Sequence, residues 1–111
     1  MAPSTVTVLY PALKEGERFD VEYYVTKHLE LAVGAWKSLG MKDFQVVKFG
    51  AAAGGDTLPY SVAAFITFDS PEGVGKAMAS PLTKGVFEDT PNFTNTKPLV
   101  LLGEAPASWS Q

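Results

Sequence analysis

The chain has 111 residues, of which 46% are hydrophobic and 19% charged, and its formal net charge is −3. This length fits one domain with one core, residues 1–111, and the negative charge gives no long-range attraction to nucleic acid or anionic lipid. Cysteine is absent, which excludes a disulfide framework, and with no signal-peptide pattern and no apolar run of about 18 residues we expect a soluble, cytoplasmic protein rather than a membrane protein.

The first half of the chain predicts a strand and then a helix. Alternating β-branched residues predict a strand over residues 5–10, followed by a polar loop. Asp20 suits the N-cap of the helix, and Gly40 suits its end. An apolar stripe at helical spacing, typical of a helix with one buried face, consists of Tyr24, His28, Leu31, Ala32, Ala35 and Leu39.

The second half predicts three further strands and a second helical region. Proline after serine is a helix start signal, and clustered glycines indicate a loop. In order, we expect a strand over 44–49, a Gly-rich connection over 50–59, a strand over 60–68, a helix from Ser70 and Pro71 to about residue 79, a shorter helix after Pro81, a strand over 93–103 and a tail over 104–111.

The order βαββαβ predicts a ferredoxin-like α+β fold. Right-handed crossovers place both helices on one face of a four-stranded antiparallel sheet. The strand over 60–68 is apolar on both faces, with Val62, Ala64, Ile66 and Phe68 on one and Ala63 and Phe65 on the other. Because the uncovered face would meet water in a monomer, we expect a homodimer whose two sheets pack face to face.

His28 is the only histidine, so it is almost the only side chain able to exchange a proton near neutral pH. Tyr24 lies four residues earlier, on the same side of the predicted helix. His28 can act as a general base facing a pocket, or it can be a core histidine bonded to a carbonyl or a tyrosine. Tyr24 can donate its hydroxyl to His28 or to a substrate oxygen, or it can simply pack. We take His28 and Tyr24 as the candidate catalytic residues.

A second group of candidates is expected to bind substrate. Asp89, Asn92 and Asn95 precede the last predicted strand and can converge at the open end of a pocket. The same residue types also form turns by bonding their own backbone, and Asn92 and Asn95 would face opposite sides of a strand. Trp36 and Phe93 are large enough to line a cavity for an aromatic ligand, or they belong to the core.

The sequence gives no sign of a metal or cofactor site. One histidine and scattered carboxylates lack ligand spacing. The Gly-rich residues 50–56 lead to a strand, and a phosphate-binding loop would need a helix there. Lys48 can hold an anionic oxygen, or it can extend to solvent at a sheet edge.

Three segments together carry a family resemblance. They read FDVEYY at residues 19–24 followed by His28, FITFDS at residues 65–70, and DTPNFTN at residues 89–95. In this order and spacing they resemble the EthD family, and the likeness extends over almost the whole chain. The resemblance implies a ferredoxin-like protomer, a dimeric α/β barrel and a ligand pocket between helices and sheet. Fold alone leaves the chemistry open.

The sequence therefore favours a cofactor-independent enzyme acting on a hydrophobic, aromatic or polyketide-like substrate. We expect proton abstraction next to a carbonyl, leading to cyclisation, dehydration, isomerisation or oxygenation. In this hypothesis His28 is the base, Tyr24 orients it or polarises the carbonyl, and an Asn amide supports the enolate. One alternative is a non-catalytic protein that binds a hydrophobic metabolite or assists an oxygenase. A third is a haem-binding barrel with His28 as axial ligand.

Overall fold

A computed structural model describes residues 3–111. The predicted domain also includes residues 1 and 2, which lie outside the described residues. The elements in chain order are β1 (Ser4–Pro11), α1 (Val21–Tyr23), η1 (Tyr24–His28), α2 (Leu29–Trp36), η2 (Lys37–Leu39), β2 (Met41–Lys48), η3 (Ala53–Gly55), β3 (Tyr60–Phe68), α3 (Pro71–Ala79), α4 (Pro81–Glu88), η4 (Thr90–Asn92) and β4 (Leu99–Glu104).

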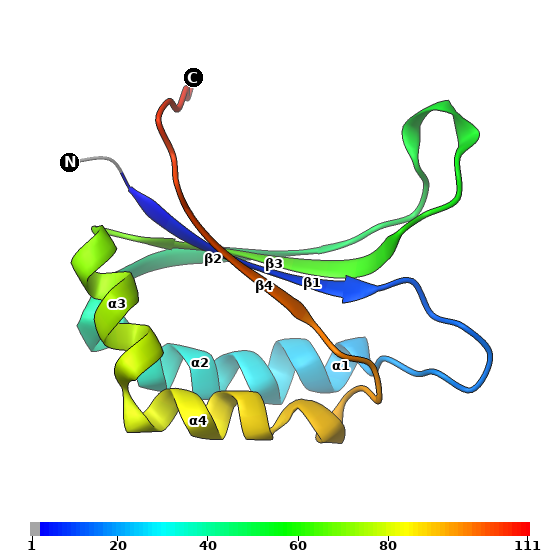
Figure 1. The fold of residues 1–111 in the computed structure, drawn as a ribbon, viewed down its shortest axis with the longest axis horizontal. Coiled ribbons are helices and arrows are strands. Elements are labelled where there is room, and N and C mark those ends of the chain that lie inside the picture. Colours follow the sequence, from blue (N-terminus) through cyan, green and yellow to red (C-terminus); the bar gives the residue numbers. More distant parts are fainter. Residues whose placement is uncertain (1–2) are drawn as a thin grey trace.

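The four strands form one antiparallel sheet in the order β2-β3-β1-β4. Helices α1, α2, α3 and α4 lie on one face of this sheet (Figure 1). The predicted ferredoxin-like α+β fold is confirmed. No helix within residues 3–111 is long and apolar enough to cross a membrane.

The two strand boundaries that differ most from prediction lie at β2 and β4. Strand β2 begins at Met41 and not at residue 44. Strand β4 begins at Leu99 and not at residue 93, and it extends through Glu104. Side-chain bonds hold the preceding stretch: Thr94 Oγ1 donates to the Arg18 carbonyl and exchanges a hydrogen bond with Thr96.

Since residues 92 and 95 both precede β4, the expectation that they lie on opposite faces of a strand does not apply. Proline 98, just before the strand, has no N–H to donate to a sheet ladder. The pairing of β4 with β1 therefore starts only after Pro98, at Leu99.

The first helical region is continuous from residue 21 to 39 but changes its winding. Asp20 caps it by accepting a hydrogen bond from the Tyr23 N–H, as predicted. In η1 the Leu29 N–H donates to the Tyr24 carbonyl, five residues back, which makes a π-helical turn. Gly40 ends the region with φ of +100°, a left-handed conformation that glycine adopts without steric cost.

The π-turn changes which residues are buried downstream of it. Leu31, predicted to be buried, is 47% exposed, whereas Leu29 is 6% exposed. A π-turn takes up more residues than an α-turn, so the apolar stripe that a regular α-helix predicts is rotated after His28. Leu29 and Trp36 then face the sheet.

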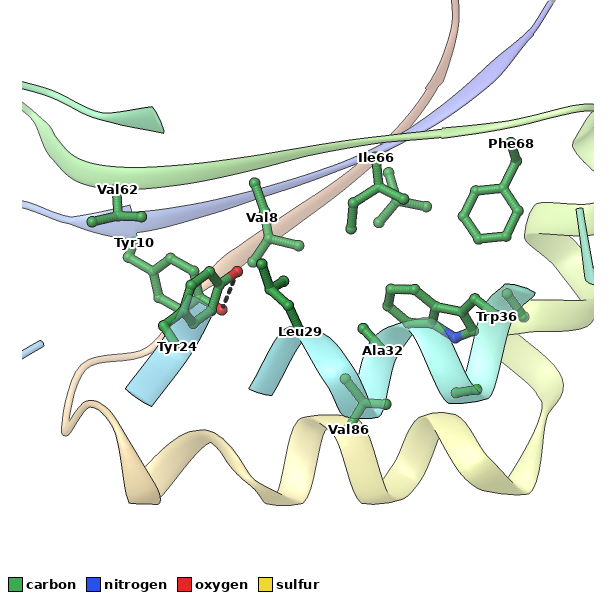
Figure 2. Packing of buried hydrophobic residues seen from close by; sticks show 14 of the residues in the cluster. Val8, Tyr10, Tyr24, Leu29, Ala32, Trp36, Val62, Ile66, Phe68 and Val86 are labelled. Carbon is green, nitrogen blue, oxygen red and sulfur yellow. Dashed lines mark hydrogen bonds between the residues drawn. The ribbon is translucent and has the colours of Figure 1, made fainter. Parts of the chain in front are cut away.

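The core lies between the sheet and the helices (Figure 2). Val6 and Val8 of β1 pair with Ile66 and Ala64 of β3, and all four point toward the helices and are buried. The neighbouring residues in each strand point the other way. On that open face the described chain leaves three large side chains 40–47% exposed: Phe65, Leu99 and Leu101.

Candidate functional site

The centre of the site is a buried pair formed by His28 and Asp89. His28 ends the π-turn η1, and Asp89 follows the last residue of α4. The His28 Nδ1 and Asp89 Oδ2 atoms are 3.0 Å apart. Both residues are at least nine-tenths buried. Within residues 3–111 this is the one contact within 4 Å between a basic and an acidic side chain.

Two further side chains hold the Asp89 carboxylate. The Tyr23 hydroxyl donates to Asp89 Oδ1 at 2.8 Å, and the Asn92 amide donates to the same oxygen at 2.7 Å. Burial alone would raise the pKa of Asp89, but the hydrogen bonds from Asn92, His28 and Tyr23 outweigh it, so this pKa lies below its ordinary value. Asp89 is therefore a carboxylate at neutral pH.

The protonation of His28 follows from its surroundings. Burial lowers the pKa of His28, although the Asp89 carboxylate opposes the shift. The imidazole is therefore neutral at pH 7. A carboxylate only accepts hydrogen bonds, so Nδ1 carries the proton and donates it to Asp89. The Nε2 atom then has a free lone pair, which is the state required of a general base.

His28 Nε2 also keeps contact with solvent. It has no hydrogen-bond partner among the described side chains. In residues 3–111, Ser4 Oγ is the one side-chain polar atom that is both fully buried and without a partner. His28 Nε2, which also has no partner, is therefore not fully buried. A nitrogen that is neither bonded nor enclosed can exchange a proton with a molecule from outside. The arrangement is thus an oriented imidazole with one nitrogen held and the other free.

Tyr24 lies on the same side of the helix as His28, as expected. The two rings stack with centroids 5.1 Å apart and an interplanar angle of 20°. The Tyr24 hydroxyl, however, receives its hydrogen bond from the Tyr10 hydroxyl at 3.4 Å (Figure 2). The partner of His28 is Asp89 and not Tyr24. Burial raises the pKa of both Tyr10 and Tyr24, so both hydroxyls stay protonated at neutral pH.

Aromatic rings fill the space between helices and sheet where the sequence predicted a pocket. Phe93 is fully buried, and its ring centroid lies 4.5 Å from that of His28. Phe93 also contacts Tyr10, Phe19 and Tyr24 through edge-on packing at 4.9 to 5.7 Å. None of the five hollows found in the described residues is lined by His28.

The other predicted binding residues lie outside this cluster. Trp36 is buried two turns further along the helical region, and its indole N–H donates to Thr83 Oγ1 of α4 at 2.8 Å. Asn95 joins two loops, because its amide donates to the Gly16 carbonyl and its oxygen accepts from the Arg18 N–H. Lys48 is exposed on the edge strand β2.

Sequence reasoning missed Tyr23, Tyr10 and Phe19. The Tyr23 hydroxyl holds Asp89, and this hydrogen bond raises the pKa of Tyr23. Two neighbouring tyrosines at the start of a helix were the available signal. In the described residues no group of three or more His, Asp or Glu side chains could hold a metal ion.

The fold and the buried pair define a class: a ferredoxin-like α+β protein with an imidazole–carboxylate pair between its first helix and the end of its last. The EthD domain model matches residues 15–97. The chain therefore belongs to the EthD family, which confirms the resemblance seen in the sequence.

Solved structures agree with this assignment at the level of the fold. An EthD-like protein from Ralstonia eutropha JMP134 is 24% identical, with a TM-score of 0.84, 99% of this chain covered and 97% of the other. An EthD family protein from Bacillus halodurans C-125 is 18% identical, with a TM-score of 0.70 and coverages of 93% and 98%.

A dimeric ferredoxin-like protein of unknown function from Jannaschia sp. CCS1 is 13% identical, with a TM-score of 0.63 and coverages of 95% and 100%. No curated protein matches the chain.

Proposed function

We propose that the protein is a cofactor-independent enzyme in which His28 transfers a proton to and from a small hydrophobic carbonyl compound. The observation that carries the proposal is the His28–Asp89 pair, with Nδ1 held at 3.0 Å and Nε2 without a hydrogen-bond partner in residues 3–111. Asp89 fixes the tautomer, and Tyr23 and Asn92 fix Asp89. A base held by a second group, itself held by others, is the arrangement that general base catalysis requires.

The chemical step moves one proton. His28 Nε2 takes a proton from the carbon next to the carbonyl, and the C–H electron pair becomes the C=C bond of an enolate whose charge lies on oxygen. The Asp89 carboxylate stabilises the imidazolium that forms. Returning the proton at another position isomerises the substrate, and attack of the enolate carbon on a second carbonyl closes a ring.

The neighbours of His28 support a flat, hydrophobic substrate. Tyr24 stacks on the imidazole and Phe93 contacts it, with Tyr10 and Phe19 behind them. Because these rings fill the space beside His28, a substrate would have to displace part of this packing. An aromatic or polyketide-like molecule would then pack among the rings edge-on or stacked. Tyr24 orients the imidazole by this stacking in the proposal. Asn92 gives one amide N–H to Asp89, and Asn95 gives one to the Gly16 carbonyl. In the proposal Asn92 therefore acts by holding Asp89.

The proposal is tested with 1-tetralone, an aromatic ketone, in D2O at pD 7.5. Wild-type protein should accelerate deuterium uptake at the carbon next to the carbonyl, followed by NMR, and His28→Gln should abolish the acceleration. Asp56→Asn, in an exposed loop away from the site, is the matched control and should act like wild type. Equal acceleration by His28→Gln and wild type would refute the role of His28.

A second candidate is a binding or accessory protein for a hydrophobic metabolite. It is favoured by the aromatic rings that fill the interior beside His28, because a ligand there must displace them. Saturable binding of 1-tetralone without deuterium uptake would favour this function. Acceleration that depends on His28 would favour the enzyme.

We further propose that the working form is a homodimer joined through the open face of the sheet. Phe65, Leu99 and Leu101 are 40–47% exposed on that face. Large apolar side chains gathered on one uncovered sheet face are typical of an interface. The Jannaschia protein with the same fold is described as dimeric. A two-fold contact would bury the same patch on both protomers.

A further inference from the structure

A hollow lies beside the turn that carries Asp89, but it is separate from His28. Its volume is about 700 Å³, and it is bounded by the loop before the first helical region, the end of α4 and the segment before β4. Thr90 and Pro91 form its wall on the side of η4. The proposed proton transfer does not use this hollow.

The hollow contains two positive side chains that no carboxylate neutralises. Arg18, the only arginine of the chain, and Lys97 both line it. Neither lies within 4 Å of a carboxylate oxygen in residues 3–111, where the one contact of this kind is His28–Asp89. Glu88 also lines the hollow, so the local balance is two cations against one anion, in a protein whose net charge is −3.

Arg18 is held in position before any ligand arrives. Its backbone N–H donates to Asn95 Oδ1 at 2.9 Å, and its carbonyl accepts from Thr94 Oγ1 at 2.7 Å. Its side chain is fixed by one hydrogen bond, from Nη2 to the Pro91 carbonyl at 2.7 Å. A guanidinium has five N–H donors, so the others are available. A fixed arginine loses little entropy on binding a ligand.

The remaining walls of the hollow are apolar or already bonded. Phe87, Pro91 and Pro98 supply apolar surface. Thr90 Oγ1 donates to the Phe87 carbonyl, so this hydroxyl is already engaged. The positive groups therefore stand beside flat hydrophobic surface, which suits a ligand with one negative group and an apolar body.

We propose that this hollow binds an aromatic carboxylate. Arg18 would take the two carboxylate oxygens with its planar fork, which matches carboxylate geometry better than a single ammonium does. Lys97 adds a second positive charge, and the aromatic ring lies against Phe87 and the two prolines. This binding site is independent of the proposed activity of His28.

The test uses benzoate as the probe, with benzamide as its neutral counterpart, in calorimetric titrations of the full chain. Benzoate should bind at one site per protomer, more tightly than benzamide. Arg18→Gln should weaken benzoate binding about tenfold or more. Lys97→Gln should weaken it severalfold, and Glu88→Gln should tighten it, since a repelling charge is removed. Lys48→Gln removes an equal charge from the edge strand and should leave binding unchanged.

Arg18→Gln also loses the bond to Pro91, so its fold is checked by near-UV circular dichroism. Lys97 is exposed, and its side chain makes no hydrogen bond or ion pair with the described residues. Lys97→Gln is therefore the second, structurally safe variant. Absence of saturable benzoate binding, or equal binding of benzoate and benzamide, would overturn the proposal. The proposal would also be overturned if Lys97→Gln and a folded Arg18→Gln both bound benzoate with the affinity of the wild-type protein. His28→Gln should still bind benzoate, so failure of the proton transfer and failure of this site are distinguishable.

Discussion

The two residues at the centre of the site, His28 and Asp89, are 61 positions apart in the chain. Sequence analysis named both, but in separate groups. No spacing rule connects the first helical region to the end of α4, so their pairing depends on how those elements pack. Phe93 was also named, with core and cavity roles both open, and it is fully buried against His28.

Replacing Asp89 by asparagine should lower the pKa of His28 further. The Asp89 carboxylate opposes the effect of burial by favouring the imidazolium, and asparagine removes that charge. An NMR titration of the single imidazole measures this directly. Asp56→Asn serves as control and should leave the His28 pKa in place. A His28 pKa that stays the same or rises in Asp89→Asn would show that the carboxylate does not act on the ring.

Asp89→Asn should lower the activity of the protein far more than it lowers the stability of the fold. Asparagine can hold the imidazole in the wrong tautomer and cannot stabilise an imidazolium, which in a comparable arrangement costs a factor on the order of 10⁴ in rate. The measurement is the rate of 1-tetralone deuteration beside the urea midpoint of unfolding. Wild-type rates in a folded Asp89→Asn protein would contradict the assigned role.

The stability of the protein should fall as pH drops below about 6.5. The pKa of His28 is lowered from 6.5 in the folded state, so the unfolded chain binds a proton at a pH where the folded chain does not. Protonation then favours unfolding, with a slope of at most about 1.4 kcal/mol per pH unit for one proton. Urea unfolding between pH 7.5 and 5.5 measures it. The stability of His28→Gln should depend less on pH over this range. An equally steep pH dependence in His28→Gln would show that groups other than His28 cause the loss of stability.

At the scale of elements, the sequence predicted the bounds of the regular strands and helices closely, but it did not predict the irregular turns. The boundaries of β3 and α3 agree with those expected from the alternation at residues 60–68 and the serine–proline start at residue 70. The π-turn could not be predicted, because its extra residue breaks the period on which helix prediction rests. For the same reason Leu31 was assigned to the core and Leu29 was not.

Helix α3 offers a matched pair of glycine substitutions. A Cβ atom at Gly73 would lie 2.5 Å from the Leu39 carbonyl oxygen, whereas a Cβ at Gly75 would meet nothing within 4 Å. Gly73→Ala should therefore destabilise the protein by about 1–3 kcal/mol, because backbone must move. Gly75→Ala should stabilise it by up to about 1 kcal/mol through helix propensity. Urea unfolding measures both, and the same sign for the two would refute the close approach of α3 to the last residue of η2.

At the scale of the whole molecule, the sequence predicted the element order and the helices on one face. It did so because each segment has its own period and the crossover rule leaves few topologies. The filled interior beside His28 was not predictable, since the same aromatic residues can line a cavity or close it. Which of these occurs depends on how Tyr10, Phe19, Tyr24 and Phe93 pack together.

Charge on the open sheet face should separate the proposed dimer. In a two-fold contact, Phe65→Glu and Leu101→Glu would each place two carboxylates in the interface, one from each protomer. The dissociation constant of the dimer should then rise at least tenfold, which corresponds to a loss of about 1.4 kcal/mol in binding free energy. Leu82→Glu, at a leucine that is 62% exposed on α4, is the control and should not change assembly. Light scattering across a dilution series gives the mass. A wild-type protein that remains monomeric throughout would contradict the dimer.

The account depends most on the state of one imidazole, and long-range ¹H–¹⁵N NMR of the wild-type protein at pH 7.5 observes it directly. His28 is the only histidine, so the spectrum contains a single side-chain pattern. The account predicts a neutral ring with the proton on Nδ1, donated to Asp89, and a free lone pair on Nε2. A ring protonated on Nε2, or an imidazolium at this pH, would contradict it.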